Sequence, residues 1–145
     1  MDLKIGGKLF TVANMERRTV LHDLYLQRVL RRSGLDRAIP EPGEDPEAYS
    51  LRLYGELLAS GAVCELLGGY LLPLGTTEDQ WSAELAAATA AHLGACNTEE
   101  DRRQVHQLAA EAVLGFFRRE LRSLAISRIS SRAAAEAHRE RSAAH

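Results

Sequence analysis

The helical class of this chain is decided by residues 98–117, TEEDRRQVHQLAAEAVLGFF. A threonine followed by three acids is typical of a helix start, because its hydroxyl caps the first turn and carboxylates favour the positive end of the helix dipole. Apolar residues then recur three and four positions apart, at Val105, Leu108, Ala109, Ala112, Val113, Phe116 and Phe117. That period predicts an amphipathic helix, which continues until the apolar pattern fades after Ile129.

Four shorter helices are predicted before this one, each between residues that start and stop helices. They span residues 15–33, 46–60, 62–72 and 77–93, and Gly68-Gly69 or Pro73 interrupts or ends the third. The proline-rich residues 36–46 show no period, so they are predicted to form an extended acidic loop.

A β-hairpin is predicted at the N-terminus, where Gly6-Gly7 separates the short runs Leu3–Ile5 and Lys8–Val12. Two strands alone are marginally stable, so the hairpin must pack against the helices. We expect its strand edges to be open to a partner's strand. The predicted fold class is mainly α: a small multi-helix domain with an N-terminal two-stranded β-hairpin.

The length of 145 residues suits a single domain. We expect a helical domain over residues 1–129, followed by a polar, basic C-terminal extension over residues 130–145. The predicted core consists of Leu24, Leu53, Leu57, Leu66, Leu71, Trp81, Leu85, Leu108, Val113, Phe116 and Phe117.

The net charge of −2 combines three blocks of different sign. The net charge is +4 over residues 1–35, −11 over residues 36–101 and +5 over residues 102–145. Such blocks either steer association with charged partners or attract one another within the fold, and the sequence leaves both readings open.

The sequence contains no pattern typical of catalysis, so we expect a protein that is not an enzyme and has no cofactor. No two histidines stand four residues apart, as in a helical zinc site, and no nucleophile elbow is present. Cys64 and Cys96 do not have the spacing of metal ligands. We expect two small buried thiols, although the sequence leaves a disulfide between them open.

Membrane and nucleic-acid roles are both disfavoured by composition. No apolar run approaches the ~20 residues that cross a bilayer, and residues 1–7 lack the apolar core of a signal peptide. We therefore expect a cytoplasmic protein. Arginines on the first and last helices are able to contact phosphates, but the isoelectric point of about 6.2 is not that of a strongly basic nucleic-acid-binding domain.

The order of these features resembles the tail assembly chaperones of long-tailed bacteriophages. The resemblance covers roughly residues 2–121 and rests on the strand–Gly-Gly–strand start Leu3–Val12, the segment Trp81–Leu85 and the late helical segment Val113–Phe117. It implies a small helical protein of the bacterial host cytoplasm. Such a protein binds the long, apolar tape measure protein and helps the tail tube protein to polymerise around it. The basic segment after Leu121 departs from the family's pattern.

A chaperone of this kind needs an apolar groove for an amphipathic client helix. Our hypothesis places that groove between the first and last helices, with Tyr25, Phe116 and Phe117 lining it. Two other functions stay open: a structural or connector component retained in the virion, and a DNA-binding regulator that uses the basic first helix. A homo-oligomer formed through the long last helix also stays open, although its heptad pattern is not sustained.

Overall fold

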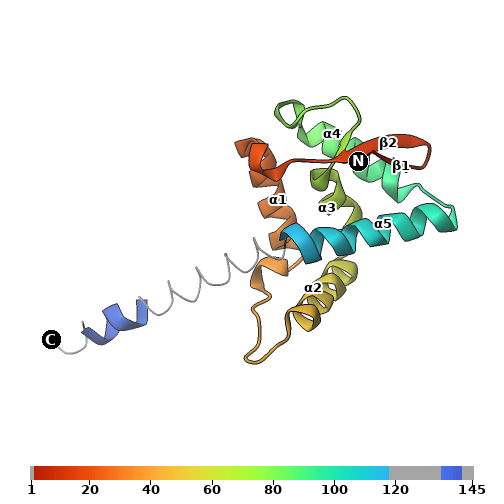
Figure 1. The fold of residues 1–145 in the computed structure, drawn as a ribbon. Coiled ribbons are helices and arrows are strands. Elements are labelled where there is room, and N and C mark those ends of the chain that lie inside the picture. Colours follow the sequence, from red (N-terminus) through yellow and green to blue (C-terminus); the bar gives the residue numbers. More distant parts are fainter. Residues whose placement is uncertain (1, 118–134, 142–145) are drawn as a thin grey trace.

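The computed structural model describes residues 2–117 and 135–141, and in that part the chain is mainly helical, as predicted (Figure 1). The α-helices of the domain are α1 (Val20–Arg32), α2 (Pro46–Ser60), α3 (Val63–Tyr70), α4 (Ala83–Gly94) and α5 (Glu99–Glu111). A π-helical segment, Ala112–Phe117, continues α5. Three short 3-10 turns lie at Met15–Arg17, Leu35–Arg37 and Glu78–Gln80.

The predicted hairpin is confirmed, but it belongs to a three-stranded antiparallel sheet. Strand β1 (Leu3–Ile5) pairs with β2 (Lys8–Val12), and β2 pairs on its other side with β3 (Leu71–Pro73). The expectation that both edges of the hairpin are open is therefore wrong for β2. The predicted helix over residues 62–72 ends early, because the chain becomes extended at Leu71 and pairs there with Val12.

Two predicted helix starts are wrong, because the capping residues at those positions begin only a short 3-10 turn, and the α-helix starts later. Asn14 caps the turn Met15–Arg17, and α1 begins later, where the Thr19 hydroxyl accepts from the amide of His22 at 3.2 Å. The predicted capping box at Thr77 likewise precedes only a 3-10 turn, and Ser82 caps α4. The cap predicted at Thr98 is confirmed, since its side chain accepts from the amide of Asp101 at 3.1 Å.

Helix α3 lies in the middle of the fold and packs against α1, α4 and α5 (Figure 1). Two glycines in α3 allow this close approach. A Cβ at Gly68 would lie 2.5 Å from the carbonyl oxygen of Ala86 in α4. A Cβ at Gly69 would lie 2.6 Å from Cδ2 of Leu26 in α1. The Gly68-Gly69 pair therefore continues the helix and sets the spacing of its neighbours.

Most of the predicted core is buried, with two corrections. The residues confirmed as buried are Leu53, Leu57, Leu66, Leu71, Trp81, Leu108 and Val113. Leu85 is only partly buried, and Leu24 is 51% exposed because it lies on the side of α1 opposite Leu26 and Leu30.

Three predictions at the C-terminal end lie wholly or partly outside the described residues. The side chains of Phe116 and Phe117 are not among those described, and neither is the predicted domain boundary after residue 129. Within the predicted extension, residues 135–141 form an exposed helical segment.

Candidate protein-binding surface

Helix α1 carries apolar residues on two opposite sides. Its buried side consists of His22, Leu26, Val29 and Leu30. Its outer side begins with Val20, Leu21 and Leu24, whose exposed fractions are 75%, 70% and 51%. Water-exposed aliphatic side chains are ordinary when scattered, but three neighbours on one helix form a patch. We call these three residues the apolar half of the α1 face.

The same outer side of α1 becomes cationic towards its C-terminal end. Arg28, Arg31 and Arg32 follow the apolar half at helical spacing, and all three are exposed. We call them the arginine half of the α1 face. Arginines in the last turns also favour the negative end of the helix dipole, which accounts for part of their placement.

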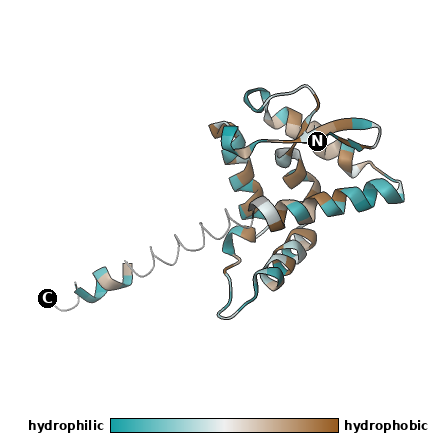
Figure 2. Cartoon of the chain, viewed as in Figure 1, coloured by the Kyte–Doolittle hydropathy of each residue, from teal (hydrophilic) through white to brown (hydrophobic). Residues whose placement is uncertain are grey.

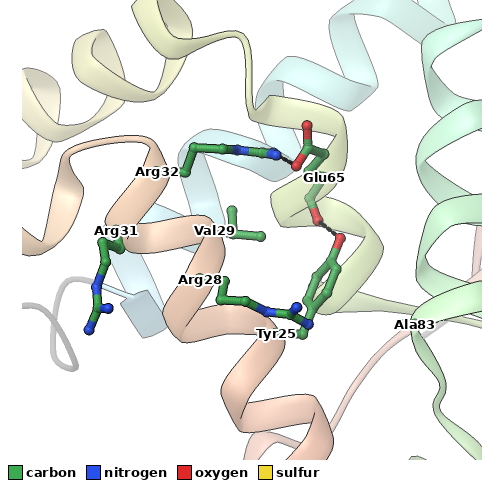
Figure 3. A pocket seen from close by; sticks show the side chains of 7 residues that line it. All are labelled: Tyr25, Arg28, Val29, Arg31, Arg32, Glu65 and Ala83. Atoms are coloured by element: carbon green, nitrogen blue, oxygen red, sulfur yellow. Dashed lines mark hydrogen bonds and ion pairs between the residues drawn. The ribbon is translucent and has the colours of Figure 1, made fainter.

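A pocket of about 510 Å³ opens beside the arginine half (Figure 3). It is lined by Tyr25, Arg28, Val29, Arg31, Arg32, Glu65 and Ala83, which belong to α1, α3 and the start of α4. In Figure 3 the side chains of Arg28 and Arg32 extend towards α3, whereas that of Arg31 extends away from it. The pocket therefore has two arginines over its opening and an aromatic ring at its side.

Tyr25 is held in place by contacts with two other elements. Its hydroxyl donates to the backbone carbonyl of Glu65 at 2.7 Å, and its ring meets Trp81 edge-on, with 5.2 Å between ring centroids. The Glu65 carboxylate pairs with Arg32. Burial raises the pKa of the Tyr25 phenol, and the nearby guanidiniums of Arg32 and Arg28 oppose that rise only in part. The phenol is therefore a neutral donor near pH 7.

Behind Tyr25, the side of the pocket is supported by a buried histidine, His22, which was not predicted from the sequence to be functional. The His22 ring stacks on Trp81 with centroids 4.4 Å apart and planes inclined by 5°. Its Nε2 lies 2.6 Å from the backbone carbonyl of Gly69, so Nε2–H donates to that oxygen. Burial lowers the pKa of His22, which keeps the imidazole neutral. This contact fixes Trp81, and through it Tyr25.

A second exposed apolar pair lies on α2 but lacks the other features of the α1 face. Leu51 and Leu58 are 64% and 44% exposed, two helical turns apart. The arginine beside them, Arg52, is bound to Glu44 through two hydrogen bonds of 3.0 and 2.7 Å. Within the described part of the chain this arginine is therefore already paired, and Leu51 and Leu58 serve as matched controls for Leu21 and Leu24.

The two cysteines are free thiols that line one small cavity of about 230 Å³. Burial raises the pKa of both Cys64 and Cys96, so both are poor nucleophiles at neutral pH. Over residues 2–117 and 135–141, no group of three or more ligating side chains is placed to hold a metal ion. In the same residues, no helix is both long and apolar enough to cross a membrane.

Of the three residues predicted to bind a partner, Tyr25 lines the pocket beside α1. Because the side chains of Phe116 and Phe117 lie outside the described residues, the groove between the first and last helices stays a prediction. The apolar half of the α1 face was not predicted from the sequence, because Leu24 was expected in the core. The available signal was that apolar residues of this helix occupy more than one side.

Searches with protein-family models, among curated proteins and among solved structures found no significant match to this chain.

Proposed function

We propose that this chain is a non-catalytic, protein-binding assembly factor that acts like a phage tail assembly chaperone. In this role it binds the tape measure protein through the α1 face, keeps it soluble and promotes tail tube assembly. The observation that carries the proposal is the exposure of Val20, Leu21 and Leu24 on one side of a well-anchored helix. The resemblance of the sequence to tail assembly chaperones supplies the identity of the partner.

The apolar half is large enough to anchor a helix of a partner. Fully burying an aliphatic side chain contributes roughly 1.5–3 kcal/mol. Given the exposed fractions of the three side chains, covering them contributes on the order of 3–6 kcal/mol, before the entropic cost of association is subtracted. The rigid pocket beside Tyr25 lowers that cost, because its wall is already ordered by the Trp81 stack.

The geometry does not favour the DNA-binding alternative. Arg18, which precedes α1, is held by Asp23 at 2.7 Å, and Arg32 in α1 is paired with Glu65, so two of the cations predicted for the first helix already have acidic partners. Aliphatic side chains also occupy the half of the outer side where further phosphate contacts would be needed. No feature of the described residues favours a virion component over a chaperone, and analysis of purified virions for this chain separates those two functions.

The test is co-expression with the tape measure protein of the same genome, followed by affinity capture and size exclusion. A soluble complex of defined stoichiometry, with the client insoluble alone, is the expected result. We expect the double variant Leu21→Asp/Leu24→Asp to lose the complex while its circular dichroism and melting temperature match the wild type.

The variant Leu51→Asp/Leu58→Asp is the matched control, because it places the same two charges at two similarly exposed leucines on α2. We expect it to keep the complex. Retention of the complex by Leu21→Asp/Leu24→Asp would rule out the α1 face as the binding surface. Absence of any complex with the wild-type chain would rule out the chaperone function itself.

A further inference from the structure

The two halves of the α1 face stand at a fixed spacing along the helix. Leu21 precedes Arg28 by seven residues, and Leu24 precedes Arg31 by the same interval. Seven residues are about two turns, or roughly 10 Å, so each leucine and its arginine lie on one line of the helix surface. A partner that lies along α1 therefore meets an apolar surface first and a cationic one two turns later.

Two of the three arginines in the arginine half have no acidic partner among the described residues. Among the described residues, Arg28 and Arg31 have neither an ion pair nor a hydrogen bond with another group. Glu65 is the only acid that lines the pocket within that part of the chain, and Arg32 already pairs with it. Within the described part of the chain, the guanidiniums of Arg28 and Arg31 are therefore available. Arg28 extends towards α3 beside the pocket, and Arg31 extends away from α3 (Figure 3).

We infer that the partner segment is an acidic amphipathic helix, with carboxylates about seven residues from the apolar side chains that anchor it. Its apolar residues cover Val20, Leu21 and Leu24, and its carboxylates lie against Arg28 and Arg31. Guanidinium–carboxylate pairs add orientation to the apolar contact, because they allow the helix only one direction along α1. This inference rests on the proposed function, since it specifies the chemistry of the client that the same face binds.

Charge argues against two other occupants. The chain's own C-terminal third, residues 102–145, has a net charge of +5, which is of the same sign as the arginine half. A nucleic acid matches the arginines but has no apolar surface to offer the exposed leucines. An acidic amphipathic helix offers both an apolar side for the exposed leucines and carboxylates for the arginines.

The inference is tested with fluorescent peptides of about 20 residues that tile the tape measure protein, titrated with the full-length chain and followed by anisotropy. We expect the peptides that bind to contain aliphatic residues and acids about seven positions apart. We expect the double variant Arg28→Glu/Arg31→Glu to weaken their binding roughly 2- to 30-fold, the range for losing two exposed ion pairs. The same variant is expected to weaken the co-expressed complex at low ionic strength.

The matched control is Lys4→Glu/Arg103→Glu, which changes the net charge equally at exposed residues of β1 and of the hydrophilic first turns of α5 (Figure 2). We expect it to bind as the wild type does. A peptide whose acids are replaced by lysine should bind Arg28→Glu/Arg31→Glu better than it binds the wild type. That rescue separates a direct charge contact from a change in the fold.

Failure of this inference is distinguishable from failure of the proposed function. If the complex forms and Arg28→Glu/Arg31→Glu leaves it unchanged at every ionic strength, the acidic client is wrong and the apolar chaperone surface stands. If the binding peptides are neutral or basic, the outcome is the same. If the wild-type chain instead binds duplex DNA or its own second copy through these arginines, and no tape measure peptide, both proposals are overturned.

Discussion

The three glycines inside α2 and α3 allow one substitution to be tested in three environments. Gly55, Gly68 and Gly69 all lie in α-helices at ordinary helical dihedral angles, so alanine is compatible with the backbone at each position. Replacing glycine by alanine in an exposed helix stabilises the folded state by about 1 kcal/mol. What differs among the three positions is the space that the new methyl group would occupy.

The expected magnitudes follow from that space. At Gly55 nothing lies within 4 Å of the added Cβ, so we expect Gly55→Ala to stabilise the protein by ~0.5–1 kcal/mol. At Gly68 the Cβ would lie 2.5 Å from a backbone oxygen of α4, about 0.9 Å inside ordinary van der Waals contact. Helix α4 must then move, and overpacking of this kind costs ~1–3 kcal/mol or more. We expect Gly68→Ala to be less stable than Gly55→Ala by at least ~1.5 kcal/mol.

Gly69→Ala should fall between the other two variants. Its Cβ would meet Cδ2 of Leu26 at 2.6 Å and Cε1 of Tyr25 at 3.0 Å, which are ends of side chains and not backbone atoms. These ends can shift, at the cost of disturbing the pocket wall beside α1. We therefore expect a smaller loss of stability than at Gly68, together with weaker binding of the client.

The assay is urea unfolding followed by circular dichroism and by the fluorescence of the single tryptophan, Trp81. Thermal melts give a second measure, with roughly 2–6 °C expected for each kcal/mol in a chain of this size. The predicted order of stability is Gly55→Ala, wild type, Gly69→Ala, Gly68→Ala. If Gly68→Ala proves as stable as Gly55→Ala, α3 and α4 do not approach each other closely at Gly68 and Ala86.

Two further predictions concern the dependence of stability on pH. Because the pKa of buried His22 is lowered, the unfolded chain binds a proton that the folded chain excludes, so the free energy of unfolding should fall as the pH drops below about 6.5. Urea titrations between about pH 5.5 and 7 should show that His22→Gln removes this slope, and an unchanged slope would contradict the buried neutral imidazole. The Glu44 carboxyl has its pKa lowered to about 2 by hydrogen bonds from Arg52, so its contribution is present above about pH 4.5 and lost as the pH falls towards 2. In Arg52→Lys, which loses the paired hydrogen bonds, acid unfolding followed by circular dichroism should begin at higher pH. An unchanged midpoint would show that the Glu44–Arg52 pair does not stabilise the loop over residues 36–46.

The elements that the sequence predicted well are those whose signals are local. The caps Asp45 and Thr98 place the starts of α2 and α5, because each side chain accepts a hydrogen bond from an amide within its own first turn. The Gly6-Gly7 turn likewise fixes the register of β1 against β2. Strand β3 was missed for the opposite reason. Its partner Val12 is remote along the chain, and three residues carry no period of their own.

The candidate site was harder to predict because α1 carries apolar residues on both sides. Periodicity identifies the helix, but it does not say which apolar side faces the core. If polar residues are assumed to face water, His22 is predicted to be exposed and Leu24 to be buried. The structure shows the reverse.

The orientation of α1 is stabilised by residues from other parts of the chain. The His22 ring is stable in the interior because Trp81 stacks on it and its Nε2–H donates a hydrogen bond to the carbonyl of Gly69. Since burial of an imidazole without such partners costs free energy, the orientation of α1 depends on two contacts that no local pattern encodes. The same two contacts turn Val20, Leu21 and Leu24 outwards. The binding surface that we propose is therefore a consequence of how the histidine is buried, and a His22 variant that rotates α1 should lose the client together with the pH dependence.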